Sequence, residues 1–96
     1  MSPKNKIKLN ILRKKLDSLD NILLNVIKTR SNLVKEVLKL KNNKSEIVDK
    51  KRINSILKKI NKKSKQKKID PKITKRIWKN MIWSFIDYER RNFKKK

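Results

Sequence analysis

Glycine, cysteine and histidine are absent from this chain of 96 residues, and proline occurs only as Pro3 and Pro71. Without Gly the chain has little means of making tight hairpin turns, whereas helices need no Gly. Without Cys and His there are no disulfide bonds and neither of the side chains that zinc prefers. Strand-like alternation of apolar and polar residues is missing too. We therefore expect an all-α protein with few, long helices and no metal site.

Long hydrophobic runs are also lacking. No apolar stretch approaches the ~20 residues that span a bilayer, and the first ten residues contain no apolar segment of signal-peptide length. We therefore expect a cytoplasmic protein that does not enter a membrane.

The charge balance is extreme, with 31 Lys and Arg against 8 Asp and Glu and a formal net charge of +23. Such a surface is typical of proteins that bind nucleic acids or acidic partners. An AT-rich genome would also produce a chain rich in Lys, Asn and Ile, with the lysines on solvent-facing helix positions. Charge alone does not separate these explanations.

The first periodic segment, residues 7–41, predicts a helix about 50 Å long at 1.5 Å per residue. Apolar residues recur along it at alternating steps of four and three; these are Leu12, Leu16, Leu19, Leu23, Val26, Leu33, Val37 and Leu40. A small monomer has too little structure to cover so long a stripe. We therefore expect an intertwined homodimer whose long helices pack antiparallel.

Two shorter helices follow a polar break at residues 42–46. Asp49 is a suitable N-cap for the second helix, whose apolar residues end at Ile60, and the basic run 61–68 predicts a frayed helix end and a loop. Asp70 followed by Pro71 predicts the start of the third helix. We expect one domain over residues 9–93, between a flexible N-terminus at 1–8 and a basic tail at 94–96, with Phe93 also loosely held.

Two charged residues fall on apolar helix faces. Arg30 occupies the stripe position between Val26 and Leu33, where an unpaired guanidinium is costly. Either the side chain extends to solvent or pairs with a distant acid, or it binds an anionic ligand. Glu89 lies one step of four beyond Phe85 and calls for a nearby cation. A plainer interpretation places Glu89 at a fraying helix end beside a surface lysine.

Helix geometry indicates which basic residues can meet. Arg30 and Lys41 are eleven residues apart, which places them within roughly 20° of one face and about 16 Å apart along a helix. Two long side chains can converge on one small anion over that distance. Arg13 lies about 25 Å from Arg30 along the same helix, so it can reach that anion only from an antiparallel second subunit.

The stretch LRKKLDSLDNILLNVIKTRSNLVKEVLKLK, residues 12–41, resembles the long first helix of the all-helical chorismate mutases. That family has a Leu-Arg near the start, a repeated Asp step, an Arg seventeen residues after the first and a Lys eleven further on. VDKKR resembles the start of the family's second helix, and IDPKITKRIWKNMIWSFIDYE resembles its third. The matching positions are Arg13, Asp17, Asp20, Arg30, Lys41, Arg52 and Glu89. The related isochorismate-pyruvate lyases share this fold.

The resemblance implies the rearrangement of chorismate to prephenate in phenylalanine and tyrosine biosynthesis, without a cofactor. Arg30 and the second subunit's Arg13 would then clamp the two carboxylates, and Arg52 would complete the cationic wall. Lys41 and a protonated Glu89 would bind the ether oxygen of the breaking bond. Further substrate contacts are implied for Asp49, Ile53 and Phe85.

Two of these residues depart from the family pattern. Ile53 stands where a Glu usually binds the substrate hydroxyl, and Phe85 stands where a Ser is common. At both positions the chain resembles the isochorismate-pyruvate lyases. Elimination of pyruvate from isochorismate is therefore an alternative reaction. A basic helical nucleic-acid binder is the alternative from another class. It would gather basic residues on one exposed stripe and would explain neither Arg30 nor Glu89, so a nucleic-acid partner is not expected.

Overall fold

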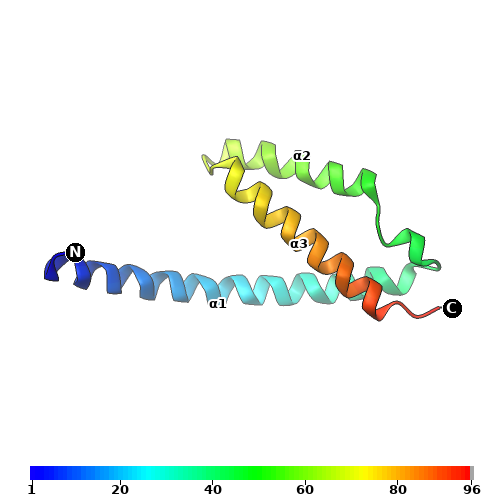
Figure 1. Ribbon diagram of the computed structural model, residues 1–96, viewed down its shortest axis with the longest axis horizontal. Coiled ribbons are helices and arrows are strands. Elements are labelled where there is room, and N and C mark those ends of the chain that lie inside the picture. The colour runs from blue at the N-terminus through cyan, green and yellow to red at the C-terminus, as the bar shows by residue number, and fades with distance from the viewer. Residues whose placement is uncertain (96) are drawn as a thin grey trace. The chain divides into compact units, whose positions relative to one another are not determined.

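The computed structural model describes residues 1–95, so Lys96, the last residue of the expected basic tail, lies outside the described residues. Within them every regular element is helical: α1 (Pro3–Leu40), the 3₁₀ turn η1 (Lys44–Glu46), α2 (Lys50–Gln66) and α3 (Pro71–Asn92) (Figure 1). This confirms the predicted all-α class and its three helices. The chain divides into two compact units, residues 1–33 and residues 34 onward, with α1 contributing to both. None of the described helices is long and apolar enough to cross a membrane.

The helix α1 begins at Pro3, earlier than the start near residue 7 that periodicity predicted. The hydroxyl of Ser2 accepts a hydrogen bond from the backbone N–H of Asn5 at 3.1 Å. Pro3 then occupies the first helical position, where its missing N–H leaves no bond unmade. The local signal for the start of α1 is therefore a capping Ser followed by Pro, and the apolar stripe joins only later.

The predicted apolar stripe of α1 is exposed in the single chain. No residue of α1 is buried, and Leu16, Leu23 and Leu33 are 58%, 56% and 62% exposed. Leu12, Leu19, Val26, Val37 and Leu40 are exposed in the same way. The first unit contains only residues of α1 and the two residues before it. Its side chains therefore have no second helix to pack against within that unit.

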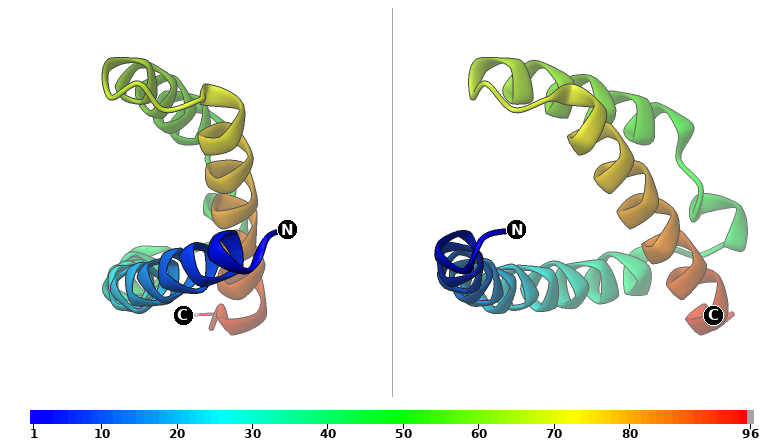
Figure 2. Two further views of the ribbon diagram at one scale, coloured as in Figure 1. Left: turned by 90° about the vertical axis from the view of Figure 1, so that its left-hand side faces the viewer. Right: turned by 60° about the vertical axis from the view of Figure 1, so that its left-hand side comes forward.

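The second unit is built on a hairpin of α2 and α3, which are in contact and diverge from their connecting turn in a V (Figure 2). Its buried core consists of Ile47, Ile82 and Ile86. Around these pack half-buried apolar side chains from the end of α1, the following loop, α2 and the C-terminus; they are Leu38, Val48, Ile53, Ile56, Leu57 and Phe93. The hairpin is thus held by one apolar face from each helix, as the helical spacing of these residues predicts.

The end of α2 differs from the prediction of a frayed end. The helix continues to Gln66, because the hydroxyl of Ser64 is buried and lies 2.7 Å from the hydroxyl of Thr74 on α3. The chain then turns through Lys68, whose φ of 57° is in the left-handed region. Glycine is the usual residue at such a position, and in a chain without glycine a lysine fills it.

Both predicted helix starts in this unit are confirmed. Asp49 caps α2 by accepting the backbone N–H of Arg52 at 3.0 Å. Asp70 caps α3 by accepting that of Lys72 at 2.9 Å, with Pro71 in the first turn. The C-terminus contains one correction: Phe93 was expected to be loosely held, but it is half-buried and packs against the core.

Candidate functional site

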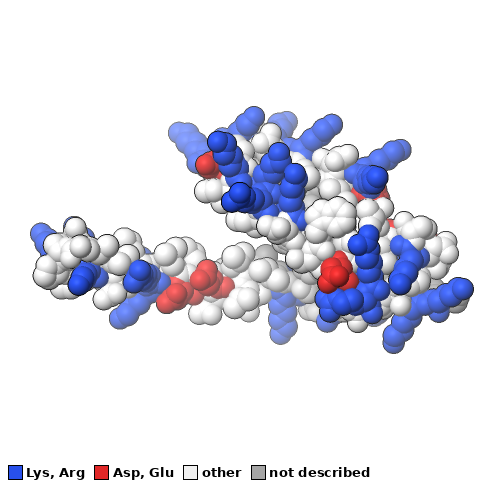
Figure 3. Space-filling model, viewed as in Figure 1, with Lys and Arg blue, Asp and Glu red and all other residues white. Residues whose placement is uncertain are grey.

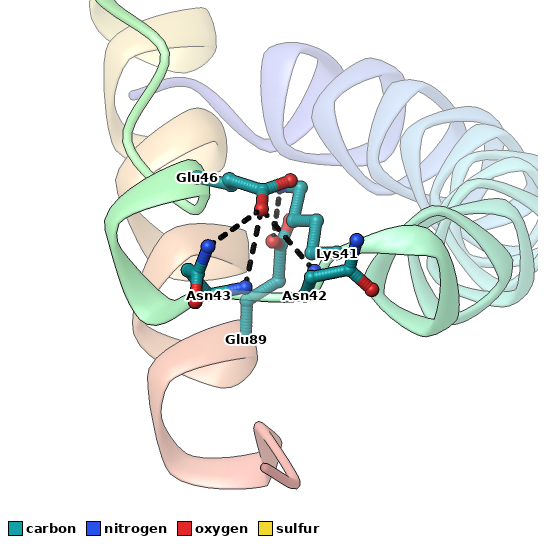
Figure 4. A network of polar contacts seen from close by, with 5 residues as sticks. All are labelled: Lys41, Asn42, Asn43, Glu46 and Glu89. Carbon is teal, nitrogen blue, oxygen red and sulfur yellow. Dashed lines mark hydrogen bonds and ion pairs between the residues drawn. The ribbon is translucent and has the colours of Figure 1, made fainter. Parts of the chain in front are cut away.

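The segment that follows α1 is fixed by a single carboxylate. Glu46 Oε1 accepts the backbone N–H groups of Asn42 and Asn43 at 3.3 and 3.1 Å, and Asn43 Nδ2 lies 3.5 Å away (Figure 4). The backbone N–H of Lys41 bonds to the carbonyl of Leu38 at 3.1 Å, which closes the last turn of α1. Lys41 is therefore anchored from both sides. Sequence reasoning missed Glu46, although Asn43 followed three residues later by Glu is a recognisable capping pattern.

The centre of the candidate site is the contact between Lys41 and Glu89. Lys41 Nζ donates to Glu89 Oε2 at 2.6 Å, and the two side chains are 16% and 9% exposed (Figure 4). Forty-eight residues of sequence separate them. The cation that an apolar setting requires for Glu89 is thus Lys41, and this pairing joins the end of α1 to the end of α3.

Glu89 is buried because of its place on α3. It lies three residues after Ile86 and seven after Ile82, both of which belong to the core, so all three share one helix face. The helix continues past Glu89 to Asn92. The interpretation of Glu89 as a carboxylate at a fraying end beside a surface lysine is therefore wrong: the residue is 7% exposed and its partner is mostly buried.

The start of α2 contributes three further predicted residues. Asp49 and Arg52 are exposed in the single chain, and the Asp49 carboxylate is engaged with the backbone of Arg52. Because the cap fixes the first turn of α2, it also fixes the direction in which Arg52 leaves the helix. Ile53 is half-buried and packs against the core. The Asp49 side chain thus has a local structural role whatever else it contacts.

The remaining predicted residues lie elsewhere. Phe85 is half-buried on α3, one turn before Glu89. Arg13 and Arg30 belong to the first unit, where Arg13 is exposed and Arg30 is half-buried. Of the predicted catalytic residues, the structure thus brings Lys41 and Glu89 into contact within the second unit. The clamp formed by the two arginines stays a prediction.

The chemistry available at Lys41 and Glu89 is that of charge and hydrogen bonding. A partly buried ammonium is a strong donor to a carboxylate or to a developing negative charge, and a carboxyl group donates or accepts according to its protonation. Among the described residues no group of three or more acidic side chains lies close enough together to hold a metal ion. The arrangement suits an anionic substrate held by cations in a partly apolar setting.

Comparison with known proteins gives one result. The family described as chorismate mutase type II matches residues 12–90. No significant match was found among curated proteins or among solved structures. The matched range includes Arg13 near its beginning and Glu89 near its end, and so spans all three helices. A match over most of the chain, in line with the all-helical fold, shows that this protein belongs to the chorismate mutase type II family.

Proposed function

We propose that this protein is a cytoplasmic chorismate mutase that converts chorismate to prephenate in the synthesis of phenylalanine and tyrosine. The observation that carries the proposal is the part-buried contact of Lys41 with Glu89 in a chain of this family. The reaction is an intramolecular rearrangement that needs no nucleophile, so its barrier is lowered by holding the substrate in the reactive conformation and by stabilising the charge that develops. Cations and one carboxyl group supply both effects.

Lys41 and Glu89 act on the ether oxygen of the breaking bond. This oxygen gains negative charge in the transition state, so an ammonium and a protonated carboxyl group stabilise it, whereas a carboxylate repels it. In the free protein Glu89 accepts from Lys41. Substrate binding therefore redirects Lys41 toward the substrate and requires a proton on Glu89. The short distance between the Lys41 ammonium and the Glu89 carboxyl group holds both groups together before substrate arrives.

The arginines hold the substrate carboxylates. Arg30 and the second subunit's Arg13 each present a planar fork that matches a carboxylate with two hydrogen bonds, and Arg52 closes the cationic wall at the start of α2. Asp49, Ile53 and Phe85 form the remaining contacts. Ile53 and Phe85 supply apolar surface that orients the ring of the substrate.

A homodimer completes the site. Half-exposed Leu and Val side chains line α1, and burying each stabilises an assembly by about 1 kcal/mol or more. Their sum is comparable with the ~5–15 kcal/mol that stabilises a whole small domain. We assign this stripe to the antiparallel contact of two α1 helices, which brings Arg13 of one chain to the site of the other.

Elimination of pyruvate from isochorismate is the second candidate reaction. The observation that favours it is the apolar, half-buried character of Ile53 and Phe85, which offer no polar group to the substrate hydroxyl. In that reaction the same cations hold the same two carboxylates, so the fold and charge of the site do not distinguish the two activities.

One assay separates these reactions. Purified protein is incubated with chorismate, and the loss of chorismate's ultraviolet absorbance and the formation of prephenate are followed. Isochorismate is tested in parallel for pyruvate release. We expect prephenate from chorismate, and at least a ~100-fold lower turnover for Lys41→Ala, the loss of about 2.7 kcal/mol of transition-state stabilisation. Lys44→Ala, which removes an exposed cation from the same loop, serves as the matched control. Pyruvate release without prephenate formation assigns the lyase activity instead.

A further inference from the structure

The proposed reaction leaves one strong feature of the molecule unused, the charge of the α2–α3 hairpin. Every charged residue of α2 is a Lys or an Arg, and α3 contains no acidic residue before Asp87. The acids at the two helix starts, Asp49 and Asp70, are engaged in capping backbone N–H groups. Figure 3 shows Lys and Arg side chains crowding the visible side of this hairpin. Its positive field is therefore little compensated.

Four lysines of α2 form a row. At 100° per residue Lys51, Lys58, Lys62 and Lys65 fall within about 60° of one another around the helix, and they span about 21 Å along it. All four are exposed. We call these residues the α2 lysine row. These four lysines share one side of α2 because of their helical spacing.

The α2 lysine row points away from the core. The side of α2 that packs toward α3 carries Ile53, Leu57 and Ser64, and helical geometry places the row roughly opposite that side. An interaction on the packed face, whether with α3 or with another chain, therefore leaves the row open to solvent. The row is also distant in sequence from Lys41 and Glu89, and neither of these residues belongs to it.

A groove between α2 and α3 flanks the row. Its lining includes Lys58, Lys75, Asn54 and Asn61, and it measures about 370 Å³. Lysine ammonium and asparagine amide groups are the donors that proteins direct at phosphate oxygens in nucleic-acid complexes. Because Lys58 belongs to both features, an anionic strand that follows the row would also meet the donors of the groove.

From these features we propose that the outer face of α2 binds the phosphate backbone of a nucleic acid, without sequence preference. A duplex carries one negative charge per ~1.7 Å of its axis, so the ~21 Å row runs along a length of duplex that carries about twelve phosphates on its two strands. The row contains no Arg or Asn to read base edges by paired hydrogen bonds and no aromatic ring to stack on a base. Its binding is electrostatic and falls steeply with salt.

The same features argue against other partners. Protein interfaces are depleted of Lys and enriched in aromatic residues and Arg, whereas the row consists of Lys alone. A helix that inserts into a membrane surface needs an apolar face beside the basic one, and the apolar face of α2 packs toward α3. A regular polyanion fits the row best.

The test uses the full-length protein and a labelled ~20-base-pair DNA duplex of mixed sequence, with fluorescence anisotropy measured from ~50 to ~300 mM salt. The test variant changes Lys51, Lys58, Lys62 and Lys65 to Gln. The matched control changes four exposed lysines of α1 to Gln and therefore has the same net charge; these are Lys6, Lys14, Lys28 and Lys35. Helicity by circular dichroism and the sedimentation coefficient establish that both variants fold and assemble like the wild type.

We expect the row variant to lose at least ~10-fold in affinity at ~100 mM salt, with the slope of log K against log salt reduced by about 2–4. The α1 variant stays within about 3-fold of the wild type, since none of its four substituted lysines lies in the row or the groove. Equal weakening of both variants overturns the proposal, because net charge alone then explains binding. Absence of duplex binding by the wild type at ~50 mM salt also overturns it. Polyglutamate of equal charge that binds as tightly as the duplex also overturns the proposal, because the row would then be assigned to an acidic protein.

Discussion

Lys41 and Glu89 form a part-buried ion pair at the point where the ends of α1 and α3 meet. Such a pair is weak evidence for stability, because the desolvation of both charges offsets most of their attraction. Its value lies in placement, since both groups are fixed before a substrate arrives. We propose that this pair serves substrate binding and chemistry, as the match to the chorismate mutase type II family suggests.

The first prediction at this scale concerns Arg30. Arg30→Ala removes a guanidinium that we assign to a substrate carboxylate, so turnover falls by at least ~100-fold. Alanine favours helix, so helicity by circular dichroism stays near wild type. Arg30→Lys also fails, because an ammonium cannot reproduce the paired hydrogen bonds of the fork.

The matched control is Arg76→Ala, which removes an exposed Arg from α3 and leaves turnover within about 2-fold. If Arg30→Ala retains most of the wild-type kcat/KM, Arg30 does not bind the substrate.

The second prediction concerns Glu89 as a hydrogen-bond donor to the ether oxygen. Gln is a neutral donor of nearly the same shape, so Glu89→Gln retains turnover, whereas Glu89→Ala removes the donor and is poor. The measurement is kcat of the three proteins under one set of conditions. An equal loss of activity in Glu89→Gln and Glu89→Ala would remove Glu89 from this role.

At the scale of helices, the caps give a prediction about stability. Asp70→Ala removes the carboxylate that accepts the N–H of Lys72 at the start of α3, so the free energy of unfolding falls by about 1 kcal/mol. Asp87→Ala breaks only an exposed ion pair with Arg91 on the same helix. This change lowers the free energy of unfolding by about 0.3–0.5 kcal/mol. Urea unfolding of both variants, read by circular dichroism, measures the difference. A smaller loss for Asp70→Ala than for Asp87→Ala contradicts the assignment of the cap.

The helices differ in how much of each could be predicted from sequence. The starts of α2 and α3 depend on Asp49, Asp70 and Pro71, which act on neighbouring backbone groups and are therefore visible in the chain. The end of α2 depends on Ser64 meeting Thr74, a contact between helices that no local pattern contains. Periodicity also missed the first turn of α1, because its residues are polar and the Ser2 cap determines the start.

The candidate site shows the same division. Helical spacing placed Glu89 on the apolar face of α3, and the structure confirms this position. That Lys41 is its partner could not be derived from spacing, because the loop fixed by Glu46 directs Lys41 back onto α3. Arg30 was recognised from its place in the α1 stripe, and its ligand stays a prediction.

At the scale of the whole molecule, the second unit has a core of its own, whereas the exposed stripe of α1 has none within the first unit. The proposed dimer would account for both observations, because antiparallel α1 helices would cover each other's stripe and carry Arg13 to the other chain's site. On this proposal mutase activity depends on assembly, and a folded, active monomer in sedimentation would contradict it.

The most direct test mixes two inactive variants. Arg13→Ala removes the residue supplied across the dimer, and Lys41→Ala removes one supplied within the chain. In a mixed dimer one site carries both defects and the other carries neither. Arg52→Ala replaces Lys41→Ala if loss of the buried cation prevents folding, since Arg52 is exposed.

The measured quantity is prephenate formation after proven subunit exchange. We predict that each variant alone is nearly inactive and that mixing restores about half of the wild-type turnover per mixed dimer, because one of its two sites is intact. Mixed dimers that form and remain inactive would contradict a shared site, and wild-type protein that forms no prephenate would contradict the proposed reaction itself.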